Sequence, residues 1–180
     1  MKNNKLQSCI VICHGKSEYE IIKYIKNAYR IPVKIVAENK GKNSIQITSI
    51  MQFLNRRDFK TKKQFENKFK IVVNSHTKIF IIMDTDDCSK MESENFKNGK
   101  MFRRYWGSRY IHPIFNTLNL EDVISRTQLE VYHQKKDAVK IFPQNISDKH
   151  EGIMHVYQAF KKAKHTNFDE VFEYFIQYKD

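Results

Sequence analysis

The chain has 180 residues, with 32 Lys and Arg against 20 Asp and Glu for a formal charge of +12, and 41% of its residues are hydrophobic. No stretch approaches the roughly 18 apolar residues of a membrane span, and the hydrophobic content is too high for a disordered chain. We therefore predict one globular domain over residues 1–180. The apolar run at 9–13 is too short for a signal peptide, so we expect a cytoplasmic protein. Three cysteines indicate neither a disulfide framework nor a zinc site.

Strands and helices alternate in the first part of the chain. Ser17 followed three residues later by Glu20 is typical of a capping box, and Ser44 can cap the next helix. Apolar runs and helical spacing predict a strand at 8–13, a helix from 17 to Pro32, a strand at 33–37 and a helix after 44.

The rest of the chain continues the pattern. Residues 79–83 form the most apolar run and predict the central strand, because a sheet covered on both faces needs uninterrupted apolar strands. Asn167 is placed to cap the last helix. We also predict a helical excursion at 55–77, strands at 110–115 and 139–142, a short helix at 120–124 and two helices over about 150–178.

This order predicts an α/β fold, a mostly parallel, Rossmann-like sheet of about four to five strands flanked by helices, with two C-terminal helices. Ligands of such sheets bind beyond the carboxyl ends of the strands. The loops at that edge are therefore the places to look for chemistry: 14–18, 39–44, 84–87 and the segment after Phe115.

Three carboxylates, Asp84, Asp86 and Asp87, directly follow the central strand, and Glu121 follows a later one. Like charges this close repel unless a cation lies among them, and oxygen ligands favour Mg²⁺ or Mn²⁺. The alternative is an Asp-rich turn that only caps the helix beginning near Ser89.

Basic residues accompany these carboxylates. Gly15 and Lys16 after the first strand, and Lys40 and Lys42 after the second, offer backbone approach and positive charge to a phosphate. Residues 1–70 hold sixteen Lys and Arg against five Asp and Glu, which favours a polyanionic partner, although a solvated face has the same composition.

A strand ending in a glycine turn, a following helix, and a later apolar strand ending in Asp84-Thr-Asp86 resemble the Toprim domain of topoisomerases, primases and OLD-family nucleases. The segment 118–123 is similar to the leucine-glutamate element of OLD-like members. The resemblance covers about residues 8–125 and leaves a C-terminal helical extension of about 150–178. It implies phosphodiester chemistry with Asp84 and Asp86 holding Mg²⁺.

His14 stands where the family has a glutamate, which is the main departure. A histidine can act as acid, base or nitrogen ligand, or it can merely end the strand beside Asp84 or Asp86. Neither Glu18 nor Glu20 is an obvious replacement: Glu18 is expected on the first helical turn, and Glu20 in the cap.

Two hypotheses of function follow, beside a third, a small-nucleotide binder, which would require selective retention of a mononucleotide over a polynucleotide. The first is a Mg²⁺-dependent nuclease in which Asp84 binds metal with Asp86, Asp87 and Glu121, while His14 moves protons and Lys16 contacts the phosphate. The second is a degenerate module that binds nucleic acid or a protein partner without cleavage. We expect DNA or RNA as partner, no membrane, and allow a homo-oligomer. The residues predicted to contact nucleic acid are Lys40, Lys42, Arg56, Arg57, Arg103 and Arg104. Trp106 beside the last two can stack bases or border the core.

Overall fold

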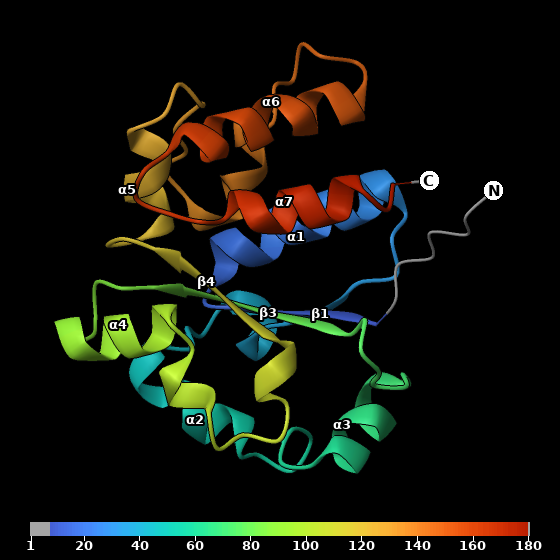
Figure 1. Ribbon diagram of the computed structural model, residues 1–180. Helices are drawn as coiled ribbons and strands as arrows, with labels where there is room; N and C mark the ends of the chain where they lie inside the picture. Colours follow the sequence, from blue (N-terminus) through green and yellow to red (C-terminus); the bar gives the residue numbers. More distant parts are fainter. Residues whose placement is uncertain (1–7, 180) are drawn as a thin grey trace.

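The computed structural model describes residues 8–179 (Figure 1). Its four strands form one sheet, in the order β2-β1-β3-β4, with every neighbouring pair parallel. The strands are β1 (Cys9–Cys13), β2 (Lys34–Val36), β3 (Lys78–Asp84) and β4 (Ile111–Asn116). The predicted α/β class and parallel sheet are confirmed, and the most apolar run forms β3, which has a neighbour on both sides.

Helices cover both faces of the sheet (Figure 1). One layer contains α1 (Lys16–Tyr29), α5 (Leu120–Ser125), α6 (Lys149–Lys162) and α7 (Asp169–Ile176). The other contains α2 (Ile47–Leu54), α3 (Lys62–Phe69) and α4 (Lys90–Lys97). Short 3₁₀ segments are η1 (Glu38–Gly41), η2 (Lys100–Phe102), η3 (Ser108–Tyr110) and η4 (Lys135–Ile141). Among the described residues, no helix combines the length and apolar character needed to cross a membrane.

Alternation along the interior strands divides the buried side chains between two cores. Val11 and Ile82 point toward α1 and the C-terminal helices, whereas Ile12 and Met83 point toward α2 and α4. Successive side chains of a strand face opposite ways, so Asp84, directly after Met83, turns to the α1 side. Strand parity thus decides which helix meets the carboxylate that ends β3.

The predicted strand at 139–142 is wrong, because the chain there forms η4. Its buried residues Ala138 and Ile141 are three positions apart, so one 3₁₀ turn places them on the same side. A run of four residues with three apolar side chains suits either structure, and packing against α1 decides between them.

Three predicted caps are also wrong. Gln46 precedes α2 in place of Ser44, and α1 begins at Lys16, before Ser17. Phe168 occupies the cap position of α7, while the Asn167 side chain binds the edge of β4. Its Oδ1 accepts a hydrogen bond from Phe115 N at 2.8 Å, and its Nδ2 donates to Pro113 O at 3.1 Å.

Candidate functional site

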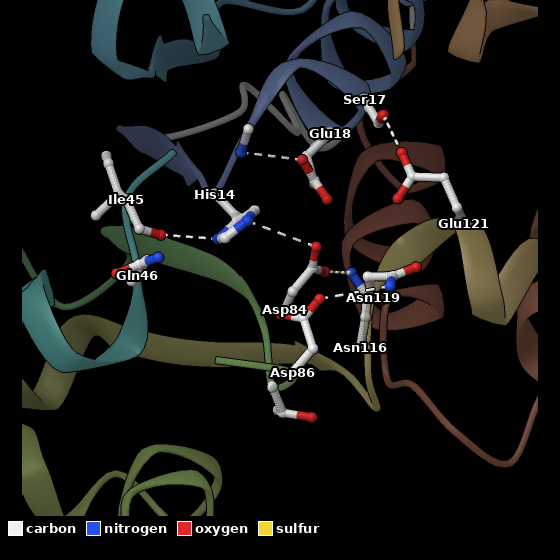
Figure 2. A network of polar contacts seen from close by, with 12 residues as sticks. His14, Ser17, Glu18, Ile45, Gln46, Asp84, Asp86, Asn116, Asn119 and Glu121 are labelled. Carbon is white, nitrogen blue, oxygen red and sulfur yellow. Dashed lines mark hydrogen bonds and ion pairs between the residues drawn. The ribbon is translucent and has the colours of Figure 1, made fainter. Parts of the chain in front are cut away.

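Polar side chains gather where β1, β3 and β4 end (Figure 2). Asp84 lies beside Asn116 in the register of the parallel pair, and His14 directly follows β1. Asp84 is 3% exposed and His14 is 6% exposed, so both belong to the interior rather than to a solvated turn. The buried wall of the site is therefore built by strand ends, as the rule for parallel sheets predicts.

His14 is oriented by the loop after η1. Its Nδ1 lies 2.8 Å from the carbonyl oxygen of Ile45. A carbonyl oxygen only accepts hydrogen bonds, so Nδ1 carries the proton of the neutral ring. Nε2 then presents a lone pair toward Asp84, whose Oδ2 lies 3.6 Å away, beyond ordinary hydrogen-bond distance. This tautomer leaves Nε2 free to accept a proton or to coordinate a cation.

Glu18 joins the site, which the sequence reasoning missed. Its side chain is buried, and its Oε2 accepts a hydrogen bond from Gly15 N at 3.0 Å. This is the glutamate half of a capping box alone, because Gly15 has no side chain, and it lies two residues before the Ser17 and Glu20 pair that we predicted. Glu18 reaches back over the first turn of α1 toward Asp84 (Figure 2). The signal was present in the sequence, because glycine is also a favoured residue at an N-cap.

Glu20 and Ser17 have other partners. Glu20 forms an ion pair with Lys16, whose Nζ lies 2.5 Å from Glu20 Oε1. Lys16, which we predicted to contact a phosphate, is therefore held along the flank of α1. Ser17 Oγ donates to Glu121 Oε1 at 2.7 Å, and Tyr132 OH donates to the same oxygen at 3.3 Å. Glu121 is therefore held beside the site by hydroxyl groups (Figure 2).

Burial and the charge of a neighbouring carboxylate raise the pKa of both interior carboxyl groups. The pKa of Asp84 rises to about 8, first through desolvation and then through the charge of Glu18, with His14 and Asn116 opposing. The pKa of Glu18 rises to about 7, again mainly through desolvation, with the charge of Glu121 adding to it. Two groups that resist ionisation side by side are stabilised as carboxylates by a cation.

A buried chain of hydrogen bonds fixes the orientation of the Asp84 side chain. Asn116 Nδ2 donates to Asp84 Oδ1 at 3.0 Å, and Asn116 Oδ1 accepts from Thr166 Oγ1 at 2.9 Å. Phe168 N in turn donates to Thr166 Oγ1 at 3.0 Å. Each donor meets an acceptor, so the amide of Asn116 has one orientation and Asp84 Oδ2 is left to face His14. The segment before α7 thereby contributes to the site.

Asp86 and Asp87 form an exposed rim of the site. Asn119 Nδ2 donates to Asp86 Oδ2 over a long 3.4 Å. The pKa of Asp87 is raised, first by desolvation, and the charge of His14 opposes the rise. The helix after this turn is capped by Ser89, which accepts from Glu92 N at 3.2 Å, so the aspartates are not used as its cap.

The η1 loop packs closely against the turn that follows His14. Gly41 has φ +82°, and a Cβ at this position would lie 2.7 Å from both Gly15 O and Lys16 Cα. Only glycine fits such a left-handed and crowded position. Gly15 is extended, with φ −148°, a conformation that any residue adopts. Gly41 of η1, not Gly15, is therefore the position that requires glycine. The η1 loop carries Lys40 and Lys42, both exposed, to this edge.

The other basic residues predicted to contact nucleic acid are exposed and lie on separate elements. Arg56 is paired with Glu38, and Arg57 follows it after α2. Arg103 and Arg104 follow η2, at the other flank of the sheet. Trp106 is only half-buried, and its Nε1 donates to Phe59 O at 2.8 Å, which places the indole at the border of a core.

No protein-family model, no curated protein and no solved structure matches the chain.

The donor set fits a hard cation in an open site. Within residues 8–179, no three His, Cys, Asp or Glu side chains form a ready-made cage for an ion. Mg²⁺ does not need such a cage, since proteins commonly hold it by one or two carboxylates together with water and substrate phosphate. Asp84 and Glu18 could supply the oxygens for such an ion, and the His14 imidazole is a ligand that Mn²⁺ also accepts.

Proposed function

We propose that the chain is a metal-dependent phosphodiesterase that cleaves nucleic acid. The observation that carries the proposal is the meeting of Glu18 and Asp84, two buried carboxyl groups with raised pKa, beside the free Nε2 of His14. Burial of two carboxyl groups costs folding free energy. Carboxyl groups with such perturbed pKa values cluster at functional sites.

The resemblance to Toprim domains supports the same reaction. In that family a glutamate ends the first strand, where this chain has His14. Glu18 brings a carboxylate back to the edge at which the family's glutamate would stand, while Asp84 and Asp86 keep the places of the paired aspartates. On this reading the chain is a working variant with its acidic group moved onto α1.

Each group then has a task. Bound Mg²⁺ or Mn²⁺ supplies polarisation of the phosphate and activation of water. Asp84 and Glu18 hold the ion, Asp86 and Asp87 complete its surroundings from the rim, and Glu121 adds negative charge beside Ser17. His14 accepts a proton at Nε2 while Ile45 O holds its Nδ1 proton in place. Lys40 and Lys42 attract the phosphate backbone.

The test is cleavage of labelled single- and double-stranded DNA and RNA by the purified protein in Mg²⁺, Mn²⁺ or EDTA. We expect cleavage with metal only, and a loss on the order of 10³-fold in Asp84→Asn, because an active-site ion supplies several kcal/mol of transition-state stabilisation. Asp58→Asn makes the same chemical change at a residue paired with Lys68, and should cleave like the wild type. Absence of cleavage in every metal, or equal cleavage by the two variants, contradicts the proposal.

A further inference from the structure

A basic hollow lies beside the edge strand β4. It has a volume of about 480 Å³ and is lined by the end of α4, by the segment through η2 and η3, and by Ile111 and Pro113 of β4. Three cations line it, Lys97, Arg103 and Arg109, and none of the described residues that line it carries a carboxylate. Hollows with one sign of charge concentrate counter-ions, so this one favours an anionic ligand.

The hollow is joined to the carboxylate site through β4. Lys97 Nζ lies 4.8 Å from the centroid of the Phe115 ring, and Phe115 is followed by Asn116, the residue that holds Asp84. At about 3.3 Å per residue of a parallel strand, Pro113 and Ile111 are roughly 10 to 17 Å from Asn116. Lys97 is ion-paired with Glu94 at 3.6 Å and only partly exposed, so Arg103 and Arg109 are the exposed cations of the hollow.

The edge of β4 is closed to a peptide strand near the site. A partner that adds to a sheet needs free backbone donors and acceptors along the edge. Pro113 has no N–H, its carbonyl accepts from Asn167, and Phe115 N donates to Asn167. The charge and the closed edge together favour a polyanion over a peptide strand.

We propose that this hollow binds the sugar-phosphate backbone of the substrate three to five nucleotides away from the scissile phosphate. The inference rests on the proposed function and names a second contact region for the same substrate. The span of 10 to 17 Å corresponds to that number of nucleotides at about 3.4 Å per nucleotide of a strand. The basic η1 loop then lies on the β2 flank of the carboxyl edge, and the hollow lies back along β4 from that edge, so the substrate leaves the site along the outer side of β4. Arg103 and Arg109 make the contacts, while Arg104 does not line the hollow.

The test measures binding of labelled oligonucleotides by fluorescence anisotropy over a range of NaCl concentrations, in EDTA so that cleavage does not proceed. Arg103→Gln/Arg109→Gln should weaken binding and reduce the slope of log affinity against log salt by about 2, one for each lost phosphate contact. Lys149→Gln/Lys162→Gln removes the same charge from two exposed positions outside the hollow and should leave the slope unchanged. Thermal unfolding checks that both variants fold.

Oligonucleotide length gives a second readout. The Arg103→Gln/Arg109→Gln variant should bind dinucleotides like the wild type and should differ only for strands long enough to reach from Asp84 to the hollow. Equal losses in the two double variants, or a loss that does not depend on length, overturn the inference, as does a wild-type protein that binds no nucleic acid. Binding as expected without cleavage in any metal supports the hollow and contradicts only the proposed reaction.

Discussion

Two sets of carboxylates meet at the carboxyl edge of the sheet, and they differ in how they are held. Glu18 and Asp84 are buried and fixed by hydrogen bonds from Gly15 and Asn116. Asp86 and Asp87 are exposed on the following turn, and the one side-chain bond to Asp86 is long. The fixed pair carries the desolvation cost, so in the proposed metal site it would define the position of the cation, and the exposed pair would adjust to it.

Replacement of Glu18 gives the largest expected contrast. Glu18→Gln keeps the shape of the side chain but removes its charge, and we expect nucleic-acid cleavage to fall on the order of 10²-fold, within the range for loss of one catalytic carboxylate or acid-base group. Glu20→Gln is the matched control, because Glu20 is on the same helix and pairs with Lys16 and Lys23 instead. Cleavage rates at saturating Mg²⁺ decide the matter. Equal effects of the two substitutions would remove Glu18 from the site.

Thr166 tests whether the orientation of Asp84 matters. Thr166→Val deletes the hydroxyl that donates to Asn116 Oδ1, so the amide can turn and Asp84 loses its fixed partner. Partners of metal ligands typically contribute 10- to 100-fold to metal affinity, and we expect Mn²⁺ binding to weaken by about tenfold.

Thr166→Ser is the control for this experiment, since it keeps the hydroxyl and should bind Mn²⁺ like the wild type. Titration of free Mn²⁺ by electron paramagnetic resonance measures the affinity without any turnover. A loss of the same size in both variants would show that packing of the Thr166 methyl group, not the hydrogen bond, supports the site.

The sequence predicts all four strands of the sheet, together with one false strand, and two of the buried residues of the candidate site. Uninterrupted apolar runs predict β1 and β3, and the rule for parallel strands places His14 and Asp84 at one edge. Glu18 was missed because serine is the stronger cap signal, so the capping box was placed at Ser17 rather than at Gly15. Because a helix has 3.6 residues per turn, two residues turn a side chain to another face: Glu18 points to the site, whereas Glu20 lies on the flank of α1.

Long-range partners could not be predicted in the same way. Thr166 contacts Asn116 across 50 residues, and nothing in the local pattern of either segment indicates the pairing. The prediction of a strand at 139–142 was wrong for a related reason. The apolar spacing of this run suits both a strand and a 3₁₀ turn, and packing against α1 decides between them. Local periodicity predicts elements, whereas the contacts that orient a site depend on how those elements dock.

The pH dependence of folding stability tests the same comparison without substrate. In the folded, metal-free protein the pKa values of Glu18 and Asp84 are raised to about 7 and about 8, whereas in the unfolded chain they lie near 4. An acid whose pKa is higher in the folded than in the unfolded protein contributes stability that is fully present below the unfolded pKa. This stability is lost as the pH rises through the folded pKa. In EDTA, the melting temperature should therefore fall by several degrees between about pH 4 and pH 8 relative to Glu18→Gln/Asp84→Asn, in which neither group ionises. Addition of Mg²⁺ should restore more stability at pH 8 than at pH 5, because the ion binds only the charged forms. Parallel melting curves for the wild type and the double variant would contradict the raised pKa values and, with them, the distinction between the buried and the exposed carboxylates.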